Sequence, residues 1–303
     1  SPEGAICIYW SLLEEAGTHE LVEELLRQGR KVLLPCHSGE CALKRVTHLA
    51  KDLLPGENRH IMEPAGHCEK ISPEEVNLFI VPGVAYDIRG GRIGFGGGYF
   101  DRVLADKRPE SGVLAPAYEC QMFRKVPSDP AYDQPVDRVL TEEREYRYLR
   151  SRMEVSDLEA MKHFAERLAG VCGKRLRLGL CGNLGVGKTT FIQFLARSLG
   201  VKGEVSSPSF VLINEYPGQV PVRHIDLYRI GESVLSEEDL GMFEETMAEF
   251  PGPVLIEWAE FGHSWLPLST PLLQLEFSSG GGRRIILETF AAEDAVLHEA
   301  VKV

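Results

Sequence analysis

The string Gly-Asn-Leu-Gly-Val-Gly-Lys-Thr at residues 182–189 constrains the fold of this chain more than any other feature. The apolar run Leu176–Cys181 precedes it and predicts a buried strand, and Thr190–Leu199 has the residue spacing of a helix. A Gly-x-x-x-x-Gly-Lys-Thr string between a strand and a helix indicates a phosphate-binding loop, because the glycines let backbone N–H groups close around phosphate oxygens. The sequence therefore predicts a nucleotide-binding α/β domain in the second half of the chain.

We expect nine consecutive residues to surround the phosphates of ATP. They are Gly182, Asn183, Leu184, Gly185, Val186, Gly187, Lys188, Thr189 and Thr190. Lys188 is expected to reach the β- and γ-phosphates, and the Thr189 hydroxyl is expected to bind Mg²⁺.

A phosphate loop also needs a second group that holds the metal or orients water. Two carboxylates qualify, since each stands at the end of an apolar run. Asp226 lies in a His-x-Asp-x-Tyr-Arg string, and Glu257 follows Val254–Ile256 and precedes Trp258. Open α/β sheets place their ligands at the carboxyl ends of strands, which favours both residues.

These motifs occur in the order seen in the bacterial TsaE family, which the second half of the chain resembles over roughly residues 154–290. The resemblance rests on Gly182–Phe191, Ser207–Phe210, His224–Arg229 and Glu257-Trp258. It implies a small P-loop domain that hydrolyses ATP slowly with Mg²⁺ as an enzyme of tRNA threonylcarbamoyladenosine formation. It also implies the TsaD and TsaB proteins as partners, which carry the transfer chemistry on tRNA.

The resemblance assigns a role to each motif. Lys188, Asp226 and Glu257 would be the catalytic residues, with Thr189 and Glu257 holding Mg²⁺ and Asp226 assisting hydrolysis. Ser207–Phe210 would form a mobile switch segment. Two positions depart from the family pattern, which usually has Asp at Asn183 and Thr at Ser209. The loss of a negative charge at Asn183 is expected to alter turnover more than binding.

Two other functions fit a P-loop. The first is a small-molecule kinase, because a P-loop fold alone does not fix the reaction. A kinase lid usually carries arginine, whereas Glu232–Glu249, where a lid would lie, contains no Lys or Arg. The second is an interaction module that ATP switches, with an inactive scaffold in the first half. Measurement of ATP turnover with and without TsaD and TsaB separates these alternatives.

The first half alternates strand-like and helix-like segments, which predicts a Rossmann-like, mainly parallel sheet with helices on its faces. We place one domain at residues 1–150 and the P-loop domain at 151–303. The charge-rich stretch Thr141–Arg152 is expected to be the connection. Ser156-x-x-Glu159 is expected to cap the helix that follows it.

The glycine-rich string from Gly90 to Arg102 dominates the first half. Together with Glu15-x-x-Thr18, Gln121 and Asp133-x-Pro-Val-Asp137, it resembles 5-formyltetrahydrofolate cyclo-ligase over about residues 5–142. That family uses ATP to close 5-formyltetrahydrofolate to 5,10-methenyltetrahydrofolate. The resemblance implies roles for nine residues: Gly94, Gly96, Gly97, Gly98 and Tyr99 with Arg92 at phosphates, Asp101 and Asp137 at Mg²⁺, and Glu15 at the folate.

The cyclo-ligase family begins with a basic helix that contacts ATP, and the printed chain starts almost at the first strand. Loss of phosphate-binding cations weakens the charge stabilisation of a transferring phosphoryl group. An inactive first domain or a fused scaffold is therefore the alternative to an active cyclo-ligase, and an assay of methenyltetrahydrofolate formation distinguishes them.

Charge and cysteine content narrow the partners and the compartment. The net charge is −12, with 19 basic and 24 acidic residues up to Arg150 and 14 and 21 after it. Neither half has the basic surplus of a protein that grips nucleic acid alone, so tRNA contact is expected only through the partners. Seven irregularly spaced cysteines suit a reducing cytoplasm, and no apolar run is long enough to span a membrane. A zinc site built from Cys36, His37, Cys41, His67 and Cys68 does not match a known ligand spacing.

Overall fold

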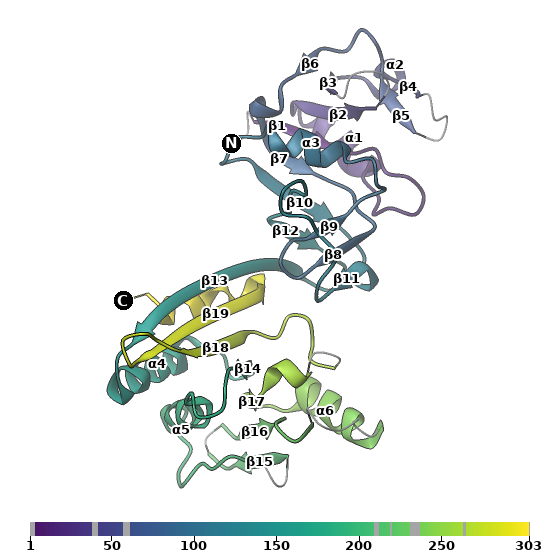
Figure 1. Cartoon of the computed structure of the whole chain (residues 1–303). Coiled ribbons are helices and arrows are strands. Elements are labelled where there is room, and N and C mark those ends of the chain that lie inside the picture. The colour runs from purple at the N-terminus through teal and green to yellow at the C-terminus, as the bar shows by residue number, and fades with distance from the viewer. Residues whose placement is uncertain are drawn as a thin grey trace. The chain divides into compact units, whose positions relative to one another are not determined.

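The computed structural model describes residues 4–37, 42–56, 61–208, 212–218, 220–230, 237–262 and 265–302, without the side chains of 237–239. The chain divides into two compact units, Ser1–Arg147 and Tyr148–Val303 (Figure 1). Among the described residues, none of the helices combines the length and apolar character that a membrane span requires.

The first unit is built on a mainly parallel sheet with the strand order β12-β10-β7-β1-β2-β3-β6. Its strands are β1 (Ala5–Ile8), β2 (Val32–Cys36), β3 (Ala42–Val46), β4 (Leu53–Pro55), β5 (Met62–Pro64), β6 (Lys70–Ile71), β7 (Val76–Ile80), β8 (Ala85–Asp87), β9 (Arg92–Ile93), β10 (Gly112–Pro116), β11 (Met122–Phe123) and β12 (Arg138–Leu140). Its helices are α1 (His19–Arg27), α2 (Leu49–Asp52) and α3 (Tyr99–Ala105), with short 3₁₀ turns at Pro73–Glu75 and Glu119–Gln121.

The central strands of this sheet are buried because their residues are apolar on both faces. Every residue of β1 and β2 is buried, and both strands pair in parallel, as does β1 with β7. Helices cover such sheets on both faces, which explains the continuous apolar runs. At one edge of the sheet, β3 pairs antiparallel with β2 and with β6. The predicted α/β class with a mainly parallel sheet is therefore confirmed for this unit.

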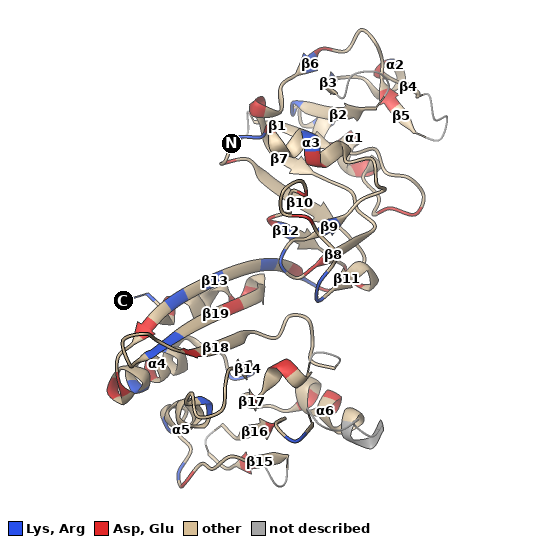
Figure 2. Ribbon diagram, viewed as in Figure 1, with Lys and Arg blue, Asp and Glu red and all other residues tan. Residues whose placement is uncertain are grey.

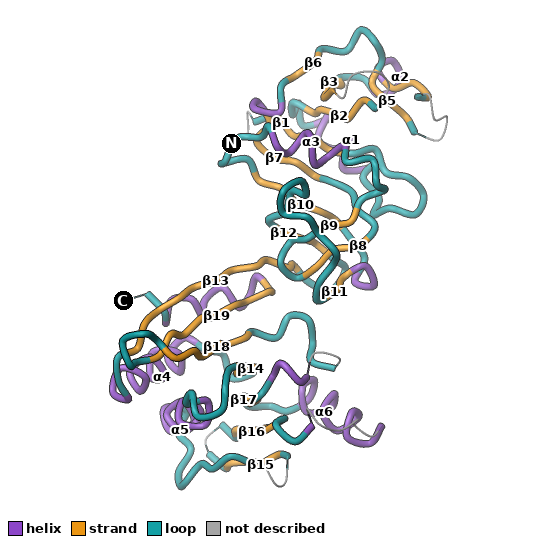
Figure 3. The backbone as a smooth tube through the Cα atoms, in the orientation of Figure 1, coloured by secondary structure: helices purple, strands orange, loops and turns teal. Residues whose placement is uncertain are grey.

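The second unit has the strand order β15-β16-β17-β14-β18-β19, and β14, β16 and β17 pair in parallel. Its strands are β14 (Arg177–Cys181), β15 (Ile213–Tyr216), β16 (Val222–Asp226), β17 (Val254–Glu257), β18 (Leu272–Phe277) and β19 (Arg283–Ala291). Its helices are α4 (Leu158–Val171), α5 (Lys188–Ser198) and α6 (Glu237–Glu249), with 3₁₀ segments at Ala259–Gly262 and Ala292–Ala300. Figure 3 shows loops joining these strands and helices in alternation.

The division between the two units falls between Arg147 and Tyr148, inside the charge-rich stretch Thr141–Arg152 that was expected to connect the domains. Most of this stretch belongs to a strand, β13 (Glu145–Val155), which was not predicted, and the predicted cap of the following helix was wrong. Charged residues of both signs lie along β13 (Figure 2), and they are tolerated because alternate positions are exposed. Helix α4 is capped by Asp157, not Ser156, since the Asp157 carboxylate accepts the N–H of Ala160 at 2.9 Å.

Candidate functional sites

The phosphate loop leaves the buried strand β14 and enters α5, which begins at Lys188. Gly182 and Gly187 have φ angles of +134° and +112°, a region that side-chain-bearing residues rarely adopt. A Cβ at Gly182 would also lie 2.3 Å from the Leu275 carbonyl oxygen, so glycine is required there for two reasons. The strand, loop and helix therefore combine as the sequence predicts.

Lys188 lies across the mouth of this loop. It is only 4% exposed, and its Nζ donates to the carbonyl oxygens of Gly182 at 2.6 Å and Asn183 at 3.2 Å. The Trp258 indole lies over the ammonium group, 3.4 Å from Nζ to the ring centroid. Burial lowers the pKa of Lys188, while the nearby carboxylates, Glu257 foremost, oppose that shift. Trp258 has a φ of +58°, a strained conformation that places its ring there.

Thr189, Glu257 and His224 form a buried chain of hydrogen bonds. The Thr189 hydroxyl donates to Glu257 Oε2 at 2.9 Å, and His224 Nε2 lies 2.9 Å from Glu257 Oε1. Glu257 is 3% exposed and His224 is fully buried. An ionised carboxylate only accepts, so His224 Nε2 carries the proton in this pair. Among the described residues, His224 Nδ1 has no hydrogen-bond partner.

Asp226 lies beside Glu257, because β16 and β17 pair in parallel with these two residues in register. Its Oδ1 accepts the Tyr228 N–H at 3.0 Å, and its Oδ2 accepts the hydroxyl of Ser207. Ser207 begins the segment expected to act as a switch. The rest of that segment from Ser209 onward, with its departure at Ser209, lies outside the described residues.

The second unit thus brings together the cation, hydroxyl and carboxylates that the sequence singles out. Thr189 and Glu257 present oxygen ligands of the kind that Mg²⁺ prefers, and the hydroxyl keeps lone pairs for a metal while its proton bonds to Glu257. A cavity of about 200 Å³ lies beside the loop. It is lined by Gly185, Val186, Gly187, Thr190 and, beyond the loop, Val155, Ser156, Asp157, Leu158, Met161, Gly281, Gly282 and Arg283. Asn183 and Leu184 are exposed at the loop tip.

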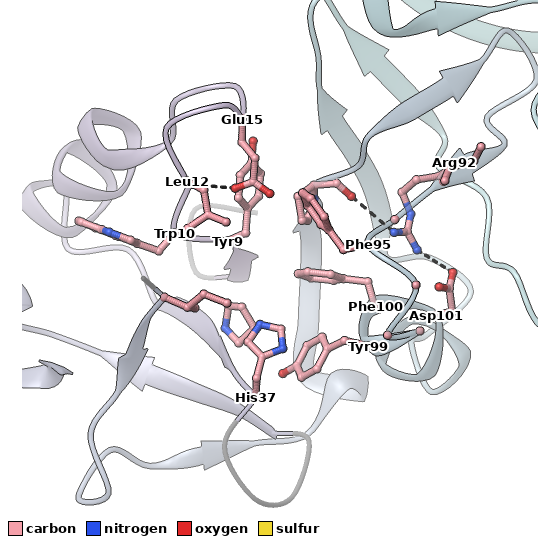
Figure 4. A pocket seen from close by; sticks show the side chains of 18 of the residues that line it. Tyr9, Trp10, Leu12, Glu15, His37, Arg92, Phe95, Tyr99, Phe100 and Asp101 are labelled. Carbon is pink, nitrogen blue, oxygen red and sulfur yellow. Dashed lines mark hydrogen bonds and ion pairs between the residues drawn. The ribbon is translucent and has the colours of Figure 1, made fainter. Parts of the chain in front are cut away.

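A larger cavity of about 630 Å³ lies in the first unit. It brings together eight of the nine residues expected there: Glu15, Arg92, Gly94, Gly96, Gly97, Gly98, Tyr99 and Asp101. Figure 4 shows Glu15 and Tyr9 on one side of the view and the Arg92–Asp101 pair on the other. The cavity therefore combines a glycine-rich anion-binding loop with aromatic walls.

Arg92 is held by a buried ion pair. Its Nη2 donates to Asp101 Oδ1 at 2.6 Å, and the two side chains are 4% and 22% exposed. Asp101 Oδ1 also accepts the N–H of Gln134 at 3.1 Å. Among the described residues, Arg92 Nε has no partner. The pair fixes a cation beside the glycine-rich loop, and it occupies Oδ1 of Asp101.

Glu15 is carried by a loop whose shape is set by Thr18. The buried Thr18 hydroxyl donates to the Tyr9 carbonyl at 2.7 Å and accepts the Ser11 N–H at 3.1 Å. Glu15 Oε2 accepts the N–H of Leu12 at 2.7 Å. Burial raises the pKa of Glu15, and the bond from Leu12 partly opposes this. The loop thus presents a half-buried carboxyl group to the cavity, with its pKa raised.

Asp137 lies elsewhere, and the cavity lining formed by the described residues does not include it. Its carboxylate accepts the N–H of Val113 at 2.7 Å, a bond that anchors strand β10. Asp133 of the same motif lines the cavity instead. Sequence reasoning also missed Tyr9, Trp10 and His37 as lining residues; an aromatic pair at the end of the first strand was the available signal.

Comparisons with known proteins were made for both halves. The family model "Threonylcarbamoyl adenosine biosynthesis protein TsaE" matches residues 155–285, and that of the "5-formyltetrahydrofolate cyclo-ligase family" matches residues 2–142. These two regions contain the phosphate loop and the larger cavity, respectively.

Individual relatives agree with the two models. A tRNA threonylcarbamoyladenosine biosynthesis protein TsaE from Treponema pallidum is 36% identical over 39% of this chain and 89% of its own length. One from Nostoc is 42% identical over 26% of this chain, and the chain spans only about half (49%) of that relative. A 5-formyltetrahydrofolate cyclo-ligase from Haemophilus influenzae is 30% identical over 45% of this chain and 74% of its own length.

Two solved structures are also similar. The NMR structure of Aquifex aeolicus 5,10-methenyltetrahydrofolate synthetase has 36% identity and a TM-score of 0.42, covering 48% of this chain and 72% of that one. The crystal structure of Bacillus subtilis YdiB has 26% identity and a TM-score of 0.41, covering 52% of this chain and 95% of that one.

Proposed function

The chain belongs to the 5-formyltetrahydrofolate cyclo-ligase family through its first half and to the TsaE family through its second, and on this premise we propose that it carries two ATP-dependent activities. The first domain, residues 1–150, converts 5-formyltetrahydrofolate to 5,10-methenyltetrahydrofolate. The second, residues 151–303, is a Mg²⁺-dependent ATPase required for tRNA threonylcarbamoyladenosine formation. It acts with TsaD and TsaB and contacts tRNA only through them. Both activities take place in the cytoplasm.

The observation that carries the ATPase proposal is the hydrogen-bonded chain from Thr189 through Glu257 to His224 beside Lys188. In the proposed mechanism, loop N–H groups and Lys188 bind the phosphates, and Thr189 with Glu257 holds Mg²⁺. Mg²⁺ held there would supply positive charge against the phosphate oxygens. Asp226 orients the attacking water, and its bond to Ser207 links that step to the switch segment.

Lys188 must exchange partners for this reaction. Its Nζ bonds to two loop carbonyls and to the Trp258 ring, whereas phosphate oxygens offer a charged acceptor. Charge-assisted bonds are roughly twice as strong as neutral ones, so phosphate binding favours the exchange. Mg–ATP is therefore expected to move Lys188 away from the indole, and a change in Trp258 fluorescence would report that movement.

The cyclo-ligase proposal rests on the cavity that joins the glycine-rich loop, Arg92 and Glu15. Loop N–H groups and Arg92 bind phosphates, and Asp101 contributes a metal ligand. The γ-phosphoryl group of ATP passes to the formyl oxygen of the folate and ADP is released. An amine nitrogen of the folate then attacks the activated carbon, and inorganic phosphate and the proton of that nitrogen leave as the ring closes. Glu15, whose protonated form burial favours, faces the folate from another wall. Asp137 uses Oδ2 to anchor β10, so a metal ligand from this residue would be its Oδ1.

One assay set tests both activities on the full chain. ATP hydrolysis is measured without folate, alone and with TsaD and TsaB, and methenyltetrahydrofolate formation is followed separately by its absorbance. Hydrolysis that depends on the partners supports the ATPase proposal. Phosphorylation of a small molecule without the partners would instead favour a kinase, and nucleotide binding without turnover would favour an ATP-switched module on an inactive scaffold.

A further inference from the structure

A third group of ligand-bearing side chains lies in the first unit, apart from the residues that line its cavity. Asp52, His67 and Cys68 place a carboxylate oxygen, an imidazole nitrogen and a thiol sulfur all within 4.8 Å of one another. Asp52 ends helix α2, and His67 and Cys68 follow strand β5. The zinc ligands considered from sequence do not gather as a set, since the His37 ring packs on Tyr99 with centroids 4.2 Å apart and Cys41 lies outside the described residues.

Main-chain hydrogen bonds hold the three residues together. The Ala65 N–H donates to the Asp52 carbonyl at 2.7 Å, and the Cys68 N–H donates to the Ala65 carbonyl at 3.1 Å. The turn at residues 65–68 is therefore fixed against the end of α2. This preorganisation reduces the cost of gathering the ligands around an ion.

The Asp52 carboxylate is oriented as a metal ligand usually is. Its Oδ2 accepts the N–H groups of Thr47 at 2.7 Å and His48 at 2.8 Å, and these bonds hold the pKa of Asp52 well below its usual range. Its Oδ1 is hydrogen-bonded to His67 Nε2 at 3.0 Å, a bond that a shared metal ion would replace. One oxygen is thus anchored by neighbouring groups, as ligating carboxylates usually are, while the other lies beside the second ligand.

The donor set favours a particular class of metal. Zinc accepts carboxylate, imidazole and thiolate, whereas Mg²⁺ and Ca²⁺ prefer oxygen alone. Ligands bonded at roughly 2.0 to 2.3 Å around a tetrahedral ion lie about 3.3 to 3.6 Å apart. The 3.0 Å separation of the Asp52 and His67 atoms is close to this, and the Cys68 sulfur lies within 4.8 Å of both.

Burial and charge around the cluster are consistent with an ion. Asp52 and Cys68 are 6% and 8% exposed, while 63% of the His67 side chain is exposed, which leaves a path from solvent. Burial and the neighbouring Asp52 carboxylate raise the pKa of the Cys68 thiol. The backbone bond to Ala65 and the Lys44 charge oppose this only in part, so the thiol proton has to be displaced by the metal. A bound cation would displace the thiol proton outright.

We propose that Asp52, His67 and Cys68 bind one divalent transition metal of the zinc type, with a fourth position open to water. The metal would tie the turn at residues 65–68 to helix α2. This site is independent of both proposed activities, because none of its three ligands lines either cavity formed by the described residues.

Metal binding to the full chain tests the site directly. The chelator-stripped protein is titrated with Co²⁺ and, in competition, with Zn²⁺. We expect one metal per chain and a thiolate-to-cobalt charge-transfer band. His67→Gln and Cys68→Ser should each weaken binding at least tenfold, and Cys68→Ser should remove the band. His163→Gln and Cys120→Ser, which change exposed residues of the same types, should leave both unchanged.

Thermal unfolding gives a second measurement. Zn²⁺ should raise the unfolding temperature of the unaltered chain, because a ligand that binds only the folded state stabilises it. The shift should disappear in His67→Gln, whose exposed side chain can change without disturbing the core. The proposal is wrong if the unaltered chain binds no Co²⁺ or Zn²⁺, or if the double variant of His67 and Cys68 binds as the unaltered chain does.

Discussion

Replacing His224 with alanine is expected to impair the second domain by loosening Glu257. His224 touches neither the phosphate loop nor a metal in the proposed mechanism; it holds Glu257 Oε1 at 2.9 Å while Thr189 bonds to Oε2. It is therefore a positioning residue. Its removal leaves one oxygen of a carboxylate that is 3% exposed without its donor.

The size of the effect follows from the charge on that acceptor. A hydrogen bond to a charged group contributes about 1.5 to 3 kcal/mol. If the loss appears in the activation barrier, hydrolysis falls roughly 10- to 100-fold. Removing a residue that hydrogen-bonds to a metal ligand typically lowers the metal affinity by about 10- to 100-fold as well. We therefore expect a lower maximal rate and a higher Mg²⁺ requirement in His224→Ala.

The assay is ATP turnover with TsaD and TsaB at a series of Mg²⁺ concentrations. His224→Gln is the matched variant, because its amide nitrogen can donate from nearly the same position as Nε2. Recovery of most of the rate in His224→Gln would show that the hydrogen bond is what matters. If His224→Ala keeps the full rate and the original Mg²⁺ dependence, the reasoning fails. Urea unfolding of each variant separates this effect from lost stability.

Three further predictions concern the other residues. Arg92→Met should abolish methenyltetrahydrofolate formation and lower stability by roughly 3 kcal/mol or more, because it leaves the Asp101 carboxylate without its cation. Arg102→Gln, which changes an exposed arginine next to Asp101 in helix α3, should keep its stability in urea unfolding. Glu15→Gln should be more stable than the unaltered chain at pH 7 but not near pH 4. The raised pKa of Glu15 means that the folded state binds its proton more tightly than the unfolded state does. The contribution of Glu15 to folding stability is therefore present at low pH and lost as pH rises through the folded pKa. A pH-independent difference would contradict this. Asn183→Asp should change ATP turnover more than ATP affinity, and equal turnover of the two proteins would refute the role given to Asn183.

The phosphate loop could be predicted from sequence because its geometry is local. Glycines at residues 182, 185 and 187, a preceding apolar strand and a following helix determine it within twenty residues. Asp226 and Glu257 were also predictable, since both end apolar runs and parallel strands present their carboxyl ends at one edge.

Contacts between distant segments could not be predicted in the same way. The bond between His224 and Glu257 joins residues 33 positions apart and depends on the register of β16 against β17. The Trp258 ring lies over Lys188 because Trp258, directly after β17, adopts a left-handed backbone conformation. Residue propensities do not predict that conformation for a tryptophan.

The first half shows a second reason for failure. Asp133 and Asp137 belong to one motif, but only Asp133 lines the cavity, because Asp137 is committed to the backbone of β10. The sequence supplies the motif but not the path of the loop that presents it. Strand β13 was missed because charge at alternate exposed positions resembles a loop composition.

The central claim is that the loop at residues 182–189 binds and turns over Mg–ATP as part of tRNA threonylcarbamoyladenosine formation. The most direct measurement is ATP hydrolysis by the full chain, without folate, in the presence and absence of TsaD and TsaB. The Lys188→Ala variant is assayed under the same conditions. We predict hydrolysis that appears with the partners and is lost in Lys188→Ala. Hydrolysis at the same rate with and without the partners, or hydrolysis that remains in Lys188→Ala, would contradict the account.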